Sequence, residues 1–518
     1  MSRANNTSRY IEIFQNRFPD FEIIASSITE KNDIVFALAR NGTEKKLILA
    51  GGEKAVIPSE FQGTKVDGEE FRFLVCNLNH ENAEALRSFL PYTKPVTLGN
   101  ASSFGFGDRL GNAGPAHLQA LIDSEPVFKP VLAQQSIREL DRTGRTAGEV
   151  MDAATWTVFR EGYKDGFGSD ADHLKTPEDI DRMIRAGFTM FTIDPSDHVN
   201  NQSQNMNGAQ LQDAFKELPW DDLNDEPDKF LQRYVGQTFR LANDHTLEPS
   251  QPAILRAAVK YGNVVRHTLD MFRYLTDTYP EHDTEVELSV DETPHPTTPE
   301  EHLIIASELQ RLGVKLVSLA PRFCGDFEKG IDFKGDLDAF RDEYLLHQAI
   351  AGEYGDYKLS IHSGSDKFSV YEAIGELGEG RVHVKTAGTS YLEAIRAVAM
   401  TDTALFREIM SFSIQRFETD RKTYHISADA GRLGDPDDYR DEELPGLLDD
   451  DNARQVFHVT FGSVLTHVPE KGAEPGFRER IMEVLERNEK VHEDCLYKHF
   501  RRHIAPFEKV YDEQQIRR

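Results

Sequence analysis

The segment GSDADHLKT, residues 168–176, places Asp170, Asp172 and His173 within four positions, just before a sequence that begins a helix. Carboxylates and a neutral imidazole are ordinary ligands for zinc, manganese and similar divalent ions. The same groups accept and donate protons in acid–base catalysis. The pattern therefore indicates either a polar turn or a metal and proton-transfer site at the end of a short strand.

Comparable polar residues stand at the ends of other short apolar segments. His362 lies inside LSIHSG, and Asp291 and Glu292 end EVELSVDE. A lone buried histidine is most often a satisfied core residue, but histidines on neighbouring strand ends can converge on one ion. The other residues of this kind are Asp194, Asp197, His198, His295, Arg322, Asp326, Glu328, Asp366, Lys367, His383 and Lys385. Their gathering at strand ends favours a functional site.

Eight predicted strands, nearly all followed by a helical segment, run through the middle of the chain. They occupy residues 95–99, 128–135, 167–174, 188–195, 285–292, 314–323, 357–365 and 381–388. Short strands alternating with helices indicate parallel βαβ units, and eight units favour a closed (β/α)8 barrel over an open doubly wound sheet. Barrel active sites lie at the carboxyl ends of the strands, where these polar residues stand.

The predicted α/β fold has three parts. Residues 1–92 are expected to form a small N-terminal α/β unit, with a hairpin turn at the Asn-Gly pair 41–42. Residues 93–400 are expected to form the barrel, with a polar, acidic insertion near 199–250. Residues 401–518 read as a mainly helical C-terminal extension.

The composition excludes several classes of partner. The 518 residues include 88 acidic and 59 basic residues, a formal net charge of −29, which argues against nucleic-acid binding. No apolar run approaches the ~20 residues that span a bilayer, and the N-terminus lacks a signal-peptide core. Three widely separated cysteines form no metal or disulfide pattern. We expect a cytoplasmic protein without nucleic-acid or membrane partners; whether it forms a homo-oligomer stays open.

The segment GFGDRLG, residues 105–111, begins with Gly-x-Gly but departs from the G-x-G-x-x-G spacing of dinucleotide sites. No convincing acidic residue ends the second predicted strand. We therefore expect a loop near the substrate, to which Asp108 or Arg109 contributes, rather than a nicotinamide site.

Five ordered motifs carry a resemblance to a known family. SSFGFGDRLG, GSDADHLKT, SLAPRFCGDFEKGIDF, LSIHSGSDKFSVY and VKTAGTSYLEA together resemble the tagaturonate epimerase family, over roughly residues 95–470. The resemblance implies a barrel enzyme that interconverts D-tagaturonate and D-fructuronate at C4. It also implies a divalent metal, whether zinc, manganese, nickel or cobalt, and a small sugar-acid substrate.

The resemblance implies roles for particular residues. Asp172 would be the proton acceptor and Glu292 the proton donor. His173 and His362 would bind the metal, with Glu328 as the third ligand. Both carboxylates suit either of two routes, cleavage and resealing of the C3–C4 bond by retro-aldol chemistry or direct proton transfer at C4.

Several assignments stay open at this stage. Asp326, His295 and Asp170 compete with Glu328 for the third ligand position. Arg322 and Lys385 are the best-placed cations for the substrate carboxylate. A metal-dependent sugar isomerase or class II aldolase acting on a keto-sugar acid is the alternative enzyme class. A carbohydrate-binding barrel without catalysis is the alternative outside enzymes.

Overall fold

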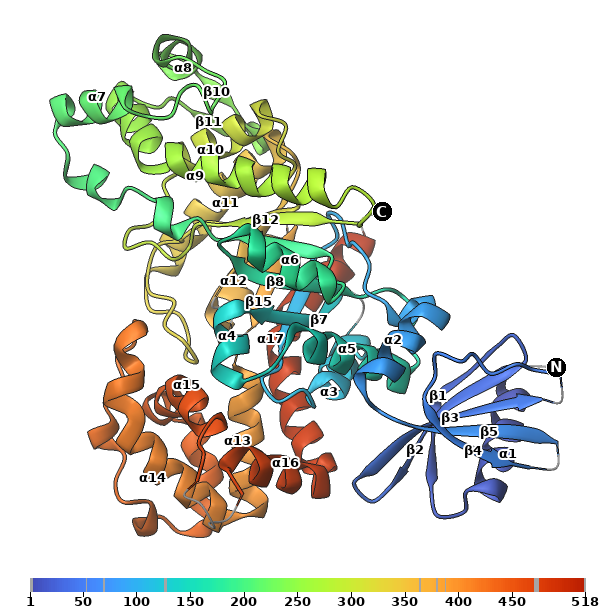
Figure 1. The fold of residues 1–518 in the computed structure, drawn as a ribbon. Coiled ribbons are helices and arrows are strands. Elements are labelled where there is room, and N and C mark those ends of the chain that lie inside the picture. Colours follow the sequence, from blue (N-terminus) through green and yellow to red (C-terminus); the bar gives the residue numbers. More distant parts are fainter. Residues whose placement is uncertain are drawn as a thin grey trace.

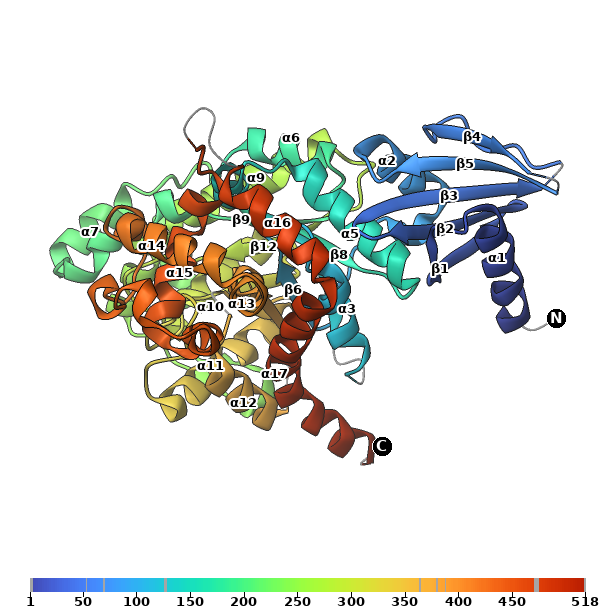
Figure 2. The same cartoon turned by 90° about the horizontal axis from the view of Figure 1, so that it is seen from below.

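Eight parallel strands close into a barrel at the centre of the molecule, as predicted (Figures 1 and 2). In the computed structural model, residues 3–516 are described apart from 53, 69, 125–127, 363–364, 379–380, 387 and 470–474. The strands are β6 (Ser103–Gly107), β7 (Lys129–Ser136), β8 (Gly168–Leu174), β9 (Met190–Ile193), β12 (Glu285–Ser289), β13 (Ser318–Ala320), β14 (Lys358–Ile361) and β15 (Val382–Thr386). They pair in chain order, and β15 closes the barrel against β6.

Helices cover the outside of the barrel and are started by capping residues. The covering helices include α3 (Gly114–Ile122), α4 (Ile137–Thr143), α5 (Ala147–Glu161), α6 (Pro177–Arg185), α9 (Gln251–Thr278), α10 (Pro299–Arg311), α11 (Leu337–Glu353), α12 (Phe368–Leu377) and α13 (Thr389–Thr401). Thr176 and Thr298 begin α6 and α10 with capping boxes, each followed by a proline. Because these caps fix where α6 and α10 begin, they also fix where the loops after β8 and β12 end.

The prediction for the first barrel strand was wrong. Residues 95–99 form no strand, and β6 begins at Ser103, so Gly105 and Gly107 lie within the strand. Phe104 and Phe106 point outward into the apolar core, while a side chain on Gly105 would collide with the Gln134 amide inside the barrel. The alternation of Phe and Gly is thus a strand pattern with a crowded inner face.

Strand alternation separates an apolar exterior from a charged interior. On β12, Val286 and Leu288 pack in the core shared with the helices. The alternating residues Glu285 and Glu287 point inward; Glu287 pairs with Lys385 of β15. Inward-facing residues near the carboxyl ends of the strands therefore share one enclosed volume.

The N-terminal unit is a five-stranded antiparallel sheet in the order β1-β2-β3-β5-β4 (Figure 1). The strands are β1 (Glu22–Lys31), β2 (Ile34–Asn41), β3 (Glu44–Gly52), β4 (Gly63–Asp67) and β5 (Phe71–Asn77), with helices α1 (Arg3–Arg17) and α2 (His80–Phe89). The hairpin at 41–42 joins β2 and β3, as predicted. Arg40 and Lys45 of this unit pair with Glu489 of α17 (Glu489–Ile516), which also pairs with Arg160 of α5, and so tie the unit to the rest of the molecule.

The segment between β9 and α9 carries its own small elements. They are η2 (Ser196–His198), η3 (Asn201–Asn205), α7 (Gly208–Lys216), α8 (Pro227–Tyr234), β10 (Phe239–Arg240), η4 (Ala242–Asp244) and β11 (Thr246–Leu247). Figure 1 shows α7 and α8 projecting beyond the barrel beside α9 and α10. Tyr234 reaches Glu308 of α10 with its hydroxyl at 2.6 Å, which fixes this segment to the barrel wall.

The C-terminal region is helical, as predicted, and packs against the barrel (Figure 2). It contains α14 (Thr403–Asp420), α15 (Asp451–Leu465), α16 (Phe477–Arg487), α17 (Glu489–Ile516) and the short helices η5 (Arg421–Thr423), η6 (Ala430–Arg432), η7 (Pro436–Asp438) and η8 (Asp441–Asp449). Phe500 of α17 packs edge-on against Phe106 of β6, with ring centroids 5.3 Å apart. The last long helix therefore covers the first barrel strand.

No helix in the described part of the chain is both long enough and apolar enough to cross a membrane.

A pair of helical glycines tests the close packing of α17. A Cβ on Gly375 of α12 would lie 2.4 Å from the backbone oxygen of Pro506 in α17, whereas a Cβ on Gly352 of α11 would meet only Ala242 at 3.4 Å. We expect Gly375→Ala to destabilise the protein by roughly 1–3 kcal/mol through overpacking. Gly352→Ala should be neutral or stabilising by up to about 1 kcal/mol. Urea unfolding measures the free energy of unfolding of both variants. Equal changes in this free energy would contradict close packing between α12 and α17.

Candidate active site

A bulge at the end of β8 positions Asp172 and His173. Ala171 pairs with Phe191 of β9, but Leu174 pairs with Ile193, so β8 carries one extra residue. His173 has a left-handed backbone with φ of 55°, uncommon for a non-glycine residue. Without the bulge, consecutive residues would point to opposite faces; with it, both side chains reach the barrel mouth.

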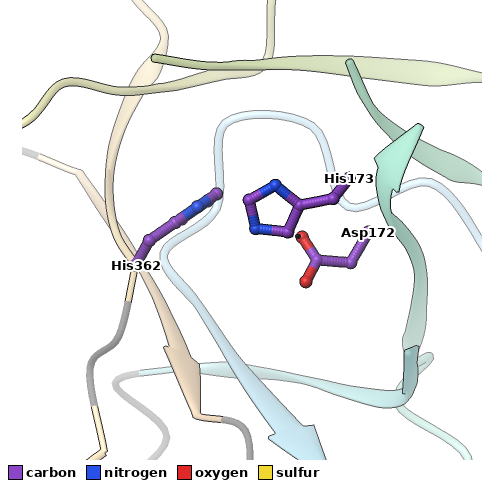
Figure 3. Close-up of side chains that lie close together, drawn as sticks. All are labelled: Asp172, His173 and His362. Atoms are coloured by element: carbon purple, nitrogen blue, oxygen red, sulfur yellow. Dashed lines mark ion pairs between the residues drawn. The ribbon is translucent and has the colours of Figure 1, made fainter. Parts of the chain in front are cut away.

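Asp172, His173 and His362 form the central group of the mouth (Figure 3). One potential ligand atom from each residue lies within 4.8 Å of the others. The two imidazole rings meet edge to face with centroids 5.3 Å apart. His362 follows β14, so residues far apart in the sequence converge as the predicted barrel requires.

Carboxylates surround both histidines. His173 Nδ1 lies 3.4 Å from Asp194, and His362 lies 2.7 Å from Glu287 and 3.2 Å from Asp291. Burial alone would lower the pKa of His173, but Asp172 and Asp194 raise it to about 10. Burial would also lower the pKa of His362, but Asp291 and Glu287 raise it to about 9. The pocket thus favours positive charge at both rings.

Lys385 is the main counter-charge beneath this group. Its Nζ lies 2.7 Å from Asp170, 2.8 Å from Asp172 and 2.7 Å from Glu287. It also donates to Thr192 at 2.6 Å. Burial would lower the pKa of Lys385, but the three carboxylates raise it well above its ordinary value.

The donor set fits a divalent cation. Two imidazoles and a carboxylate are typical ligands for zinc and related ions. His173 turns its Nδ1 toward Asp194 at 3.4 Å and its Nε2 toward Asp172 at 3.8 Å, so one ring nitrogen can face an ion while the other is held by a carboxylate. The surrounding carboxylates outnumber the permanent cation Lys385, so a dication could supply the positive charge that protons otherwise bring to the rings.

Two cavities open at the mouth. The first, of about 290 Å³, is lined by Arg138, Asp291, Glu292, Pro321, Arg322, Phe323, Phe327, Lys329, His362, Tyr424 and His425. The second, of about 450 Å³, is lined by Ile137, Arg138, Asp141, Arg142, His173, Lys175, Asp179, Asp194 and Glu292. Arg138 and Glu292 line both cavities and form an ion pair of 3.2 Å. A small polar molecule in the first cavity would therefore face two histidines, two carboxylates and several cations.

Three of the predicted site residues, His362, Glu292 and Arg322, line the first cavity, and two, Lys385 and Glu328, lie elsewhere. Glu292 and Arg322 line it, and the Glu292 side chain is 37% exposed. Lys385 is only 4% exposed, lines neither cavity and is held by three carboxylates, which argues against contact with a substrate carboxylate. Because Lys385 is buried in the barrel interior, it is not placed to bind the substrate carboxylate as the sequence predicted.

Glu328 does not join the histidines. Its carboxylate accepts hydrogen bonds from Ser427, from Gln455 at 2.8 Å and from Lys334 at 3.0 Å. These bonds outweigh burial and lower the pKa of Glu328 to about 2. The loop after β13 turns this side chain toward the C-terminal helices, so Asp172 is the carboxylate that the structure groups with both rings.

The other candidates divide in the same way. Arg109 is buried against Glu139 at 2.8 Å and stacks on Phe461, and Asp108 caps backbone amides, so neither lines the two cavities. Asp326 lies 3.6 Å from His425, whose side chain is 80% exposed. His425, which comes from the C-terminal region, also lines the first cavity.

Sequence reasoning missed three residues of the site. Glu287 is hidden in the alternating strand EVELS, Arg138 lies in the first turn of α4, and Tyr424 lies 250 residues after the end of β8. The alternation of acidic and apolar residues in β12 was a usable signal for Glu287. No sequence signal linked Tyr424 to the mouth, because the C-terminal fold brings it there.

These features define a (β/α)8-barrel enzyme with a histidine–carboxylate cluster at the carboxyl ends of its strands. The profile of the tagaturonate epimerase family matches residues 24–507. The chain belongs to this family, an isomerase family, which confirms the predicted resemblance.

Relatives match almost the whole chain. The tagaturonate/fructuronate epimerase of Thermotoga maritima is 44% identical over 495 residues, 95% of this chain and 98% of its own. A glycerol-complexed crystal structure of the fructuronate-tagaturonate epimerase UxaE from Cohnella laeviribosi is 35% identical with a TM-score of 0.88, covering 96% of this chain and 99% of that one. The native crystal structure of that enzyme gives a TM-score of 0.87 and covers 97% and 99%.

Replacing Lys385 tests the charge balance under the site. Lys385→Met leaves three buried carboxylates without their shared cation, which we expect to cost roughly 3–5 kcal/mol near neutral pH. In the folded variant, burial and repulsion raise the pKa of the three acids, so they take up protons more readily. The loss of unfolding free energy relative to the parent should therefore be smaller at about pH 5 and larger toward about pH 8. Lys46→Met, which removes an exposed pair with Glu44, is the control. The free energies of unfolding of both variants are measured with urea at both pH values. Equal losses of stability in Lys385→Met and Lys46→Met would contradict the prediction.

Proposed function

We propose that this enzyme interconverts D-tagaturonate and D-fructuronate at C4. The observation that carries the proposal is the near full-length match to the epimerase of Thermotoga maritima, at 44% identity. The histidine–carboxylate group at the barrel mouth supports it, because that position is where barrel enzymes carry out their chemistry. We also propose that the chain divides near residues 92 and 400 and acts in the cytoplasm, as its sequence predicts.

Asp172 is proposed as the proton acceptor and Glu292 as the proton donor. Burial raises the pKa of Asp172, but the neighbouring charges of His173 and Lys385 lower it by more, so this carboxylate is ionised, as a proton acceptor must be before the reaction. Glu292 approaches from the loop after β12, beside Arg138, whereas Asp172 comes from β8. Two groups on different strands suit inversion at a carbon, which needs access from both faces.

His173 and His362 are proposed to hold a divalent metal, with Asp172 as the neighbouring carboxylate. When bound, the ion would supply Lewis-acid polarisation of a substrate oxygen. Asp194 and Glu287 orient the two rings from behind through contacts of 3.4 and 2.7 Å.

Arg322 is proposed to bind the carboxylate of the sugar acid. Its Nε is buried without a hydrogen-bond partner in the described part of the chain, and the residue lines the first cavity. Arg138 and Lys329 line the same cavity and replace Lys385 as the additional cations. Guanidinium groups suit a carboxylate because two N–H groups can donate to its two oxygens.

The proposed metal set can be tested by metal analysis. We expect His173→Ala and His362→Ala each to lose most of the metal held at the mouth and to lose turnover. Glu328→Gln should keep its metal, because its carboxylate is engaged by Ser427 and Gln455. Elemental analysis of the purified variants decides. Full occupancy in His362→Ala, or metal loss in Glu328→Gln, would overturn this set.

Replacing the two proposed proton-transfer groups tests the chemistry. Asp172→Asn and Glu292→Gln keep the side-chain shape, and each should slow epimerisation by roughly 10²–10⁴-fold while substrate binding persists. Formation of the epimeric ketose is followed by NMR in hexuronate solutions. Parental rates in both variants would refute the acid–base assignment, and metal loss in Asp172→Asn would reassign that residue to metal binding.

The same assay in deuterium oxide separates the two routes. Deuterium entering C4 during epimerisation indicates direct proton transfer, whereas complete retention of the C4 hydrogen indicates cleavage and resealing of the C3–C4 bond. Glu442→Gln, at an exposed residue of η8 that lines neither cavity, serves as the matched control for loss of one carboxylate.

A further inference from the structure

We propose that Asp366, His499 and His503 form a second, structural metal site, separate from the group at the barrel mouth. Asp366 lies in the turn between β14 and α12, and both histidines lie on α17. One potential ligand atom of each residue lies within 4.8 Å of the others. All three residues are enclosed, with 3%, 6% and 0% of their surfaces exposed.

The spacing on α17 suits one ion. Residues four apart on a helix lie on the same face, so His499 and His503 present their rings side by side. Both Nε2 atoms face the same oxygen of Asp366, at 3.1 Å for His499 and 3.5 Å for His503. Ligand atoms about 2.0–2.1 Å from one ion are separated by roughly these distances at near-tetrahedral angles.

Two of the three ligand atoms lack hydrogen bonds. Asp366 Oδ1 and His499 Nε2 are buried without a hydrogen-bond partner in the described parts of the chain, although they lie 3.1 Å apart. The contact therefore lacks the alignment of a hydrogen bond. Two ligand atoms that converge on a common third point have this geometry, and buried polar atoms without partners are rare in folded proteins.

The outer contacts also match a metal site. His503 Nδ1 lies 2.9 Å from the backbone oxygen of His499, which directs its Nε2 lone pair toward Asp366. His499 Nδ1 faces Glu393 of α13 at 3.4 Å. Arg454 of α15 donates to the other Asp366 oxygen at 2.5 Å. Metal-binding histidines are commonly oriented by a carbonyl or carboxylate behind the ring in this way.

One existing bond would have to yield. The Asp366 amide donates to His503 Nε2 at 3.0 Å, so this nitrogen is already an unprotonated acceptor. An ion would take the lone pair from the amide. The competing arrangement is a protonated His499 between the carboxylates of Asp366 and Glu393, which needs no metal.

The site would join the C-terminal helix to the loops of the barrel mouth. Asp366 lies four residues after His362, and its neighbour Lys367 donates to the backbone oxygens of Glu328 and Ile331. Asp366 itself adopts a left-handed backbone with φ of 63°. Zinc or a similar ion with nitrogen and oxygen ligands would fasten this turn to α17 without touching substrate.

The experiment counts metal in variants of the full-length protein produced in Co²⁺-supplemented medium. His173→Ala/His362→Ala removes the proposed ligands at the mouth and leaves α17 intact; it should retain about one ion per chain with visible absorption of a low-coordinate cobalt site. His499→Gln/His503→Gln should lose that absorption and unfold at lower temperature. His492→Gln, a buried histidine of the same helix, should keep it.

The outcomes separate this proposal from the catalytic one. A His173→Ala/His362→Ala protein that folds but holds no metal overturns the second site. So does an unchanged metal count in Asp366→Asn and His499→Gln/His503→Gln. Metal that depends only on the α17 histidines would support the second site and refute metal binding at the mouth.

Discussion

The ammonium of Lys385 inside the barrel is the interaction on which the site depends. It lies within 2.8 Å of three carboxylates, two from β8 and one from β12. Without this cation, burial and mutual repulsion would make the three carboxylates take up protons; burial, with smaller effects of Asp172 and Glu287, still raises the pKa of Asp170 to about 6. Lys385 therefore lets a single enclosed volume hold ionised acids next to two histidines. The same burial removes it from contact with substrate.

Above this charge layer, backbone geometry decides which side chains reach the mouth. The extra residue in β8 places Asp172 and His173 on the same side, which regular strand alternation forbids. Asp194 and Glu287 then orient the rings of His173 and His362. The left-handed backbone of His173 and the carboxylates behind both imidazole rings therefore hold the side chains of the mouth in place before a ligand binds.

The C-terminal helices complete the barrel in two ways. Tyr424 and His425 contribute to the first cavity, while Ser427 and Gln455 hold Glu328 away from the histidines. On another side, α17 covers β6 through Phe500 and brings His499 and His503 to the turn after β14. A region that reads as a simple helical extension thus shapes loops that follow β13 and β14.

The sequence by itself determined the alternation of strands and helices, the barrel, and the positions of His173, His362 and Glu292 at strand ends. These follow from local periodicity and capping, which act over a few residues. Only the tertiary structure decided that β6 begins at Ser103. The Phe residues of this segment pack against helices outside the barrel and Gly105 faces Gln134 inside it, and both contacts involve residues distant in the sequence. It likewise decided the partners of Glu328 and Lys385. A side chain's partners depend on contacts between distant segments, and charge and residue type alone do not specify them.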